Sequence, residues 1–72
     1  MNWAQEQRIK WIGDMLHVYG FVNRSHIERM FRVSTPQASH DLKLFRNMHP
    51  GAAEYDAMAK TYKPRTPHQG EE

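Results

Sequence analysis

Residues 33–42 (Val-Ser-Thr-Pro-Gln-Ala-Ser-His-Asp-Leu) constrain the fold of this chain more than any other segment. Ser34 is a favoured N-cap residue, and Gln37 three positions later completes the pattern of a capping box. Pro36 suits the first turn of a helix, where its missing N–H is not needed. The segment therefore predicts a helix over residues 34–48, which stops because Pro50-Gly51 follows.

The two faces of this predicted helix differ in their chemistry. Ala38, Leu42 and Phe45 recur at helical spacing and form one apolar stripe. The opposite face holds small, polar or basic side chains and no carboxylate, namely Pro36, Ser39, His40, Lys43 and Asn47. An apolar face for the core and a polar, basic face for solvent are typical of a recognition helix that lies on DNA.

The composition sets outer limits on the class of protein. The 72 residues have room for one domain with a small core. The chain contains no cysteine, which excludes disulfides and thiolate metal sites and is expected in a reducing cytoplasm. The N-terminus shows no secretory-signal pattern, and no apolar run approaches the length of a membrane span, so we expect no membrane association.

The charge is distributed unevenly along the chain. The formal net charge is only +2, but residues 20–46 hold five basic and two acidic side chains, whereas residues 50–72 hold three basic and four acidic ones. Positive charge therefore gathers around the predicted helix, as binding to a nucleic acid requires. An ordinary solvated surface is the alternative explanation of the same pattern.

A first helix is predicted over residues 4–19, with Gly20 as its C-cap. Its apolar residues fill half of the helical circumference, which is wider than the stripe that a surface helix usually buries. These residues are Ile9, Trp11, Ile12, Met15, Leu16, Val18 and Tyr19. Either this helix is the main wall of a small core, or Trp11, Met15 and Val18 belong to an interface with a partner.

A second helix is predicted over residues 24–31, with Asn23 as its N-cap. Its inward-facing residues are expected to be Ile27, Met30 and Phe31. Only Arg32-Val33 separates this helix from the Ser34 cap, and two helices joined by so short a turn form a helix-turn-helix unit. Arg32 occupies a position where glycine is common, which is a departure from the usual pattern.

Residues 53–55 and 61–63 each contain a tyrosine and flank a five-residue connection, which predicts a β-hairpin. Residues 57–59 could instead form one helical turn, and Phe21-Val22 could add a short third strand. The predicted fold is a winged helix-turn-helix over residues 1–63, mainly α with a small β-hairpin. The proline-bearing polar segment 64–72 is predicted to be a disordered tail.

Several short motifs occur in a consistent order along the chain: Tyr19-Gly20, Val22-Asn23-Arg24-Ser25, Phe31 with Val33-Ser34, Pro36-Gln37-Ala38-Ser39, Asp41-Leu42, Pro50-Gly51, Tyr55-Asp56 and Ala59-Lys60 with Tyr62. Through them, residues 9–63 resemble the N-terminal winged helix-turn-helix domain of bacterial WYL-domain transcriptional repressors, a group associated with phage-defence loci. Residues 34–42 are more distantly similar to the S-x-x-T-x-x-x-D-L signature of DeoR-type winged helices.

The resemblance implies a DNA-binding role for residues 23–25, for the helix that starts at Ser34 and for the hairpin around Lys60. Members of that group continue into a WYL domain thought to sense a ligand and into a C-terminal dimerising extension. This sequence ends at Glu72, so we expect an excised DNA-binding domain or a naturally short relative, with no small-molecule ligand of its own. Besides double-stranded DNA, the candidate partners are a second copy (a homodimer) and a C-terminal regulatory domain.

Recognition helices enter the major groove by their N-terminal end, so base contacts are expected from the first turns of this helix. The candidates are Thr35, Pro36, Gln37, Ser39 and His40. Glutamine can pair with adenine, and threonine or proline can contact a thymine methyl group, although Gln37 could instead cap the Ser34 backbone.

Phosphate contacts are expected from the later turns of the helix, from the start of the second helix and from the hairpin. The candidates are Arg24, Ser25, Ser34, Lys43, Arg46, Lys60, Thr61 and Lys63. Asp41 faces no obvious substrate, and we expect it to form a salt bridge with an arginine.

Other classes of function find little support in the sequence. The five histidines lack metal-ligand spacing, and no phosphate loop, nucleophile motif or carboxylate pair occurs, so we expect no metal, no cofactor and no catalytic residues. The preferred hypothesis is sequence-specific binding of duplex DNA as the reading part of a transcriptional repressor, in the cytoplasm at the nucleoid. The alternatives are a small phage or mobile-element winged helix that docks on a repressor or polymerase, and a role in DNA packaging or recombination.

Overall fold

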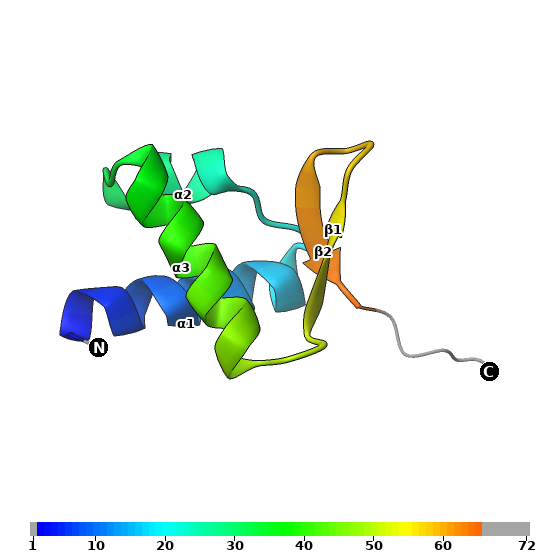
Figure 1. Ribbon diagram of the computed structural model, residues 1–72, viewed down its shortest axis with the longest axis horizontal. Coiled ribbons are helices and arrows are strands. Elements are labelled where there is room, and N and C mark those ends of the chain that lie inside the picture. The colour runs from blue at the N-terminus through cyan, green and yellow to red at the C-terminus, as the bar shows by residue number, and fades with distance from the viewer. Residues whose placement is uncertain (1, 66–72) are drawn as a thin grey trace.

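The computed structural model describes residues 2–65, which form three helices followed by a two-stranded antiparallel sheet. The helices are α1 (Trp3–Val18), α2 (Arg24–Phe31) and α3 (Thr35–Met48), and the strands are β1 (Ala53–Asp56) and β2 (Thr61–Pro64). Figure 1 shows the three helices crossing one another at one side of the molecule and the hairpin standing at the other. The predicted mainly α fold with a small hairpin is confirmed.

Local sequence determines where each helix begins. The side chains of Asn2, Asn23 and Ser34 each accept a hydrogen bond from the backbone N–H three residues later. The capping box predicted at Ser34 is only half formed, because the Gln37 side chain bonds to Asp41 instead of the Ser34 backbone. The complete capping box lies at α2, where His26 Nδ1 accepts from the Asn23 N–H.

Two residues in the left-handed region of the backbone map follow the first two helices. Gly20 has φ of 81° as a left-handed cap requires, but it lies one residue beyond the observed C-cap, Tyr19, and not at the C-cap as predicted. Its N–H donates to the Met15 carbonyl at 3.1 Å. Arg32, with φ of 55°, ends α2 and begins the turn into α3. A side chain in this conformation costs about 1–2 kcal/mol, so the turn of the helix-turn-helix carries local strain.

The core lies where the three helices meet the hairpin. The predicted stripe of α3 (Ala38, Leu42 and Phe45) is buried as expected, together with Ile9, Ile12, Leu16, Val22 and Ile27. The prediction that Met30 faces inward is wrong, since its side chain is 58% exposed. Ile27 and Phe31, one helical turn apart, already fill the core-facing side of this short helix.

The apolar arc of α1 is wider than the core that it covers. Trp11 and Met15 are half-buried against the core, and the Trp11 ring meets the Phe31 ring edge-on at 5.3 Å between centroids. Val18 and Tyr19 remain exposed at the end of the helix. Helix α1 is therefore the main wall of the core, which was one of the two predicted alternatives. Part of its apolar arc stays exposed to solvent.

The hairpin pairs Ala53 with Pro64 and Asp56 with Thr61, which leaves the four residues 57–60 in the turn instead of the predicted five. These residues form the turn that closes the hairpin, as the preferred prediction has it. The predicted third strand is reduced to a single bridge, in which Val22 and Tyr62 exchange two backbone hydrogen bonds of 2.9 and 2.8 Å.

The ordered fold extends past the predicted domain boundary at residue 63. Pro64 belongs to β2, and the Arg65 N–H donates to the Ala52 carbonyl at 3.2 Å. These two residues were expected in a disordered tail, but Pro64 pairs with Ala53 in the hairpin and Arg65 bonds to the backbone of Ala52. The remainder of that predicted tail, residues 66–72, lies outside the described residues. None of the described helices is both long and apolar enough to span a bilayer.

Candidate nucleic-acid interface

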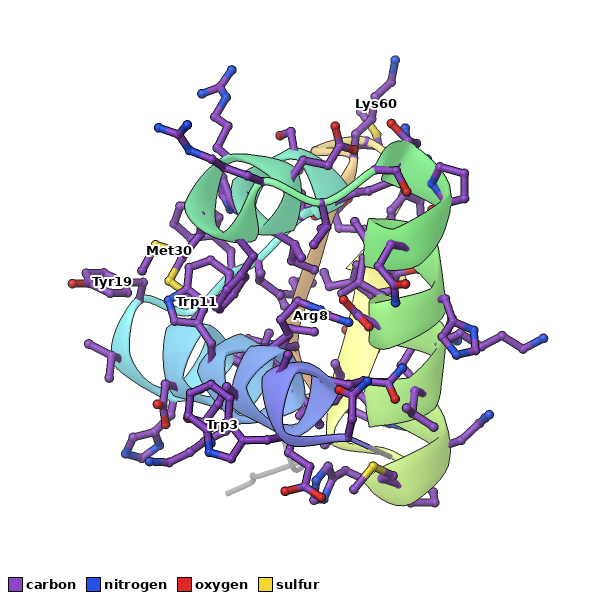
Figure 2. All side chains as sticks on the ribbon, turned by 90° about the vertical axis from the view of Figure 1, so that its left-hand side faces the viewer. Trp3, Arg8, Trp11, Tyr19, Met30 and Lys60 are labelled. Atoms are coloured by element: carbon purple, nitrogen blue, oxygen red, sulfur yellow. The ribbon has the colours of Figure 1, made fainter. Side chains whose placement is uncertain are left out.

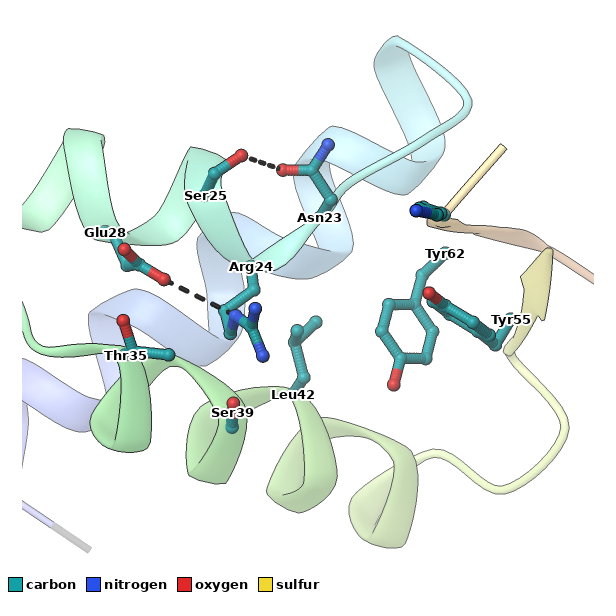
Figure 3. Close-up of a pocket in the computed structure, with 10 residues that line it drawn as sticks. Asn23, Arg24, Ser25, Glu28, Thr35, Ser39, Leu42, Tyr55 and Tyr62 are labelled. Carbon is teal, nitrogen blue, oxygen red and sulfur yellow. Dashed lines mark hydrogen bonds and ion pairs between the residues drawn. The ribbon is translucent and has the colours of Figure 1, made fainter. Parts of the chain in front are cut away.

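A hollow of about 540 Å³ separates the start of α2, the first half of α3 and the hairpin. Its lining comes from α2 with the residue before it (Asn23, Arg24, Ser25, Glu28), from α3 (Thr35, Ser39, Leu42) and from the hairpin (Tyr55, Lys60, Tyr62). Figure 3 labels all of these residues except Lys60. Three segments far apart in sequence thus contribute to one surface. The hollow brings together five of the predicted DNA-contacting residues: Arg24, Ser25, Thr35, Ser39 and Lys60.

The outward face of α3 carries no accessible negative charge. Pro36, Ser39, His40, Lys43 and Asn47 are all exposed, as their positions on the helix predicted. The one acidic residue of α3 is Asp41, and it is fully buried. A polyanion that approaches this face therefore meets hydroxyl, imidazole, amide and ammonium groups without carboxylate repulsion.

Asp41 organises a buried polar cluster behind that face. Its Oδ2 accepts from Arg8 Nε of α1 at 2.5 Å, which confirms the predicted salt bridge with an arginine. Its Oδ1 accepts from Gln37 Nε2 at 3.0 Å. The structure thus places the half-buried Gln37, a predicted base contact, with one N–H of its amide directed inward to Asp41.

Several predicted phosphate contacts also have partners within the fold. Arg24 pairs with Glu28 at 3.5 Å, Lys63 pairs with Asp56 at 3.5 Å, and the Arg46 guanidinium lies 5.5 Å from the centre of the Tyr62 ring. The remaining partners are hydrogen bonds made by three hydroxyl groups: Ser25 to the Asn23 side chain, Thr61 to the Val22 carbonyl, and Ser34 from the Gln37 N–H. Within residues 2–65, Lys43 and Lys60 form no ion pair.

The turn of the hairpin is built on Asp56. Its Oδ1 accepts from the Met58 and Ala59 N–H groups at 3.0 and 3.1 Å. The Ala59 N–H, followed by the Lys63 ammonium and the Met58 N–H, holds the pKa of Asp56 below its ordinary value. The sequence analysis predicted the hairpin but missed the role of Asp56 in its turn, although an aspartate just before a tight turn is a known signal for such bonding.

The aromatic wall of the hollow was missed as well. Tyr55 and Tyr62 are directly paired across the two strands, and their ring centroids lie 5.0 Å apart. The register of the hairpin was the signal that could have predicted this pair, because facing residues on antiparallel strands contact each other.

The three residues of the predicted partner interface do not all line the same surface in the structure. Trp11 and Met15 join His26, Arg29 and Met30 around a second hollow of about 370 Å³, which Val18 does not line. Figure 2 shows Trp3, Trp11, Tyr19 and Met30 along one side of the molecule, away from Lys60. An apolar strip on this side is therefore separate from the hollow beside α3.

Comparison with known proteins places this architecture in a family. Residues 4–70 match the family model described as the BrxR transcriptional regulator winged helix-turn-helix domain. The chain belongs to this family. The predicted resemblance to the winged helix domains of WYL-domain repressors is thereby confirmed.

This BrxR-family chain is also similar to curated repressors from several bacteria. It is 38% identical over 62 residues to the DNA-binding transcriptional repressor CapW of Escherichia coli (strain KTE188), 36% to CapW of Pseudomonas aeruginosa and 34% to CapW of Stenotrophomonas maltophilia. Each match covers 86% of this chain but 21% of the relative. These relatives are named as repressors and not as enzymes, in agreement with the expectation that the chain is not an enzyme.

Proposed function

We propose that this chain binds duplex DNA sequence-specifically and serves as the reading domain of a transcriptional repressor. One observation carries the proposal: α3 exposes an acid-free polar face beside a hollow to which Lys60 adds a positive charge and Arg24 an ion pair with Glu28. The similarity to proteins named DNA-binding transcriptional repressors supports the same function.

In this proposal the first turns of α3 read base edges in the major groove. Thr35, Pro36, Ser39 and His40 are exposed there and available for that role. Gln37 is a weaker candidate, because Asp41 uses one N–H of the amide that bidentate pairing with adenine requires. Each good base contact is worth about 1–3 kcal/mol of discrimination.

Phosphate contacts would orient the domain on the duplex without reading its sequence. Lys43 and Arg46 extend along α3, Arg24 and Ser25 stand at the start of α2, and Ser34 precedes α3. On the hairpin, the ammonium groups of Lys60 and Lys63 are the principal candidates. Thr61 is the least suited of the predicted set, since its hydroxyl already holds the Val22 carbonyl.

The chain spans about a fifth of the length of the curated relatives that it matches. One such domain alone would bind DNA with modest affinity and steep salt dependence, because phosphate contacts dominate. Two copies on paired half-sites would bind much more tightly through their high effective concentration. We therefore propose that the domain acts in pairs, as a homodimer or through a further regulatory domain, at the bacterial nucleoid.

A protein-docking role is the second candidate, and one observation favours it. Tyr19 and Met30 expose apolar side chains on the side of the molecule away from Lys60, and Val18, next to Tyr19 in the sequence, is exposed as well. Docking would depend on this strip, whereas DNA binding would depend on α3. A role in DNA packaging or recombination would use the same contacts as a repressor and would differ in its biological setting.

The test is binding of the 72-residue chain to a labelled random-sequence duplex, followed by fluorescence anisotropy at low and raised salt. Lys43→Glu should weaken binding by about ten-fold or more, since it places a carboxylate against phosphate. Lys10→Glu changes the net charge equally on an exposed position of α1 that does not line the hollow, and it should have little effect.

If both substitutions weaken DNA binding equally, the interaction is a non-specific attraction by net charge. Unchanged binding by both Lys43→Glu and His40→Ala would overturn the proposal. For each variant, amide shifts in the NMR spectrum would identify the contacted face. Absence of shifts on α3 and the hairpin, with the fold intact, would favour docking instead.

A further inference from the structure

Met58 occupies an unusual position for a large apolar side chain. It is 95% exposed, more than any other large hydrophobic residue in the described part of the chain. It stands in the turn of the hairpin between two alanines, Ala57 and Ala59, so it protrudes from a narrow tip. A side chain this exposed buries almost no apolar surface on folding and therefore contributes little to the stability of the fold.

The turn that carries Met58 is held in one shape. Asp56 Oδ1 accepts hydrogen bonds from the backbone N–H groups of both Met58 and Ala59. Lys60 closes the turn with φ of 55°, a conformation that a lysine rarely adopts. The backbone of the tip is thus fixed before any partner arrives, and only the methionine side chain remains to adjust.

The tip lies on the same side of the molecule as the start of α3. Lys60 lines one hollow with Thr35 and Ser39 of that helix, and Figure 2 shows Lys60 at the end of the molecule where α3 begins. Met58 is two residues away from Lys60 in the same turn. A duplex seated on the first turns of α3 would therefore have the tip of the hairpin beside it.

The charges around the tip also favour a nucleic acid. The carboxylate nearest to Met58 is Asp56, and the Lys63 ammonium lies 3.5 Å from its Oδ2. Lys60 adds an exposed positive charge at the end of the turn. Met58 is therefore an apolar group next to a cation, with the adjacent negative charge compensated.

We propose that Met58 is an apolar wedge that enters the minor groove next to the recognition helix and partly unstacks one base step. This inference rests on the proposed DNA binding and adds a mode of recognition to it. The minor groove is about 6 Å wide, which suits a tip whose neighbours are only alanines. Methionine is among the side chains that other proteins insert in this way, and such insertion kinks DNA by roughly 20–90°.

The wedge would make binding depend on base pairs that the side chains of α3 do not contact. Pyrimidine–purine steps unstack most easily, so a site with such a step under the tip would bind more tightly than one without it. The hairpin would then contribute to specificity through the deformability of DNA, whereas Lys60 would only hold the backbone.

The experiment uses a duplex selected from a random pool by the 72-residue chain itself. Bending is measured by energy transfer between dyes at the duplex ends, and affinity by titration of the same duplex. Met58→Ala should abolish most of the bend and weaken binding on the order of five-fold, whereas Met58→Leu should keep both. Met30→Ala is the matched control, since Met30 is another exposed methionine outside this face.

The outcomes separate the inference from the proposed function. If the chain selects no duplex, both are refuted. If the chain binds its duplex and Lys43→Glu prevents this, but Met58→Ala leaves the bend and the affinity unchanged, DNA binding stands and the wedge is refuted. If Met58→Ala loses the bend while the melting temperature of the free protein is unchanged, the wedge is supported. An unchanged melting temperature shows that the substitution does not destabilise the fold.

Discussion

Arg8 and Asp41 form a buried ion pair that joins α1 to α3 across 33 positions of sequence. The Arg8 side chain is only 12% exposed and that of Asp41 not at all, with 2.5 Å between Nε and Oδ2. The same carboxylate holds Gln37 on the first half of α3. This pair therefore controls both the crossing of the two helices and the position of one candidate base-reading side chain.

Asp41→Ala should lower the free energy of unfolding by about 3 kcal/mol, because it leaves the Arg8 guanidinium without its buried partner. Urea denaturation followed by circular dichroism measures the change. The double variant Arg8→Met with Asp41→Leu should recover most of the loss, since apolar residues of similar volume can replace a buried ion pair. A single variant within about 0.5 kcal/mol of the wild type would contradict the proposed role.

Arg32→Gly should raise the free energy of unfolding by about 0.5–1 kcal/mol, since glycine adopts the left-handed conformation at φ of 55° without steric conflict. Arg29→Gly is the matched control, because Arg29 lies within α2 and the same change there should cost about 1 kcal/mol. Thermal unfolding of both variants tests the prediction. Destabilisation by both would show that Arg32 forms contacts that outweigh its backbone strain.

The hairpin turn should weaken in acid through Asp56. Its pKa in the folded chain is lowered, first by the hydrogen bond from the Ala59 N–H, so the stabilisation is complete above the pKa of the unfolded chain. It is lost as the pH falls through the lower pKa of the folded state. Carboxyl carbon shifts in an NMR titration should place the midpoint for Asp56 below that of the same residue in denaturant.

Lys63→Met provides a check on the cause of this shift. Because the backbone N–H groups of Ala59 and Met58 also lower the pKa of Asp56 and remain in this variant, removal of the Lys63 ammonium should raise that pKa only in part. A midpoint that returns fully to the value in denaturant would assign the whole effect to the lysine.

Thr61→Val should loosen the attachment of the hairpin to the segment before α2. The Thr61 hydroxyl donates to the Val22 carbonyl at 3.0 Å, and loss of such a bond costs about 1 kcal/mol. Hydrogen exchange of the Tyr62 N–H, which bonds to the same carbonyl, should become faster. Thr61→Ser keeps the hydroxyl and should behave as the wild type. If Thr61→Val instead weakens only DNA binding, with unchanged exchange, Thr61 acts on phosphate as the sequence analysis expected.

Features that depend on neighbouring residues were readable from the sequence. The starts of α2 and α3 follow from Asn23 and Ser34, whose side chains satisfy backbone N–H groups three residues away. The spacing of Ala38, Leu42 and Phe45 predicted the buried face of α3, because helical periodicity alone decides which side chains share a side. The exposed polar face opposite followed from the same periodicity.

Other features depended on residues distant in the chain and required the tertiary structure. The sequence predicted that Asp41 pairs with an arginine, but only the crossing of α1 and α3 selects Arg8, and with it the inward position of Gln37. Met30 was expected in the core, yet Ile27 and Phe31 fill the core-facing side of α2. Periodicity describes one element at a time, whereas the partner that a face meets, and how much of it is covered, depends on how the elements pack.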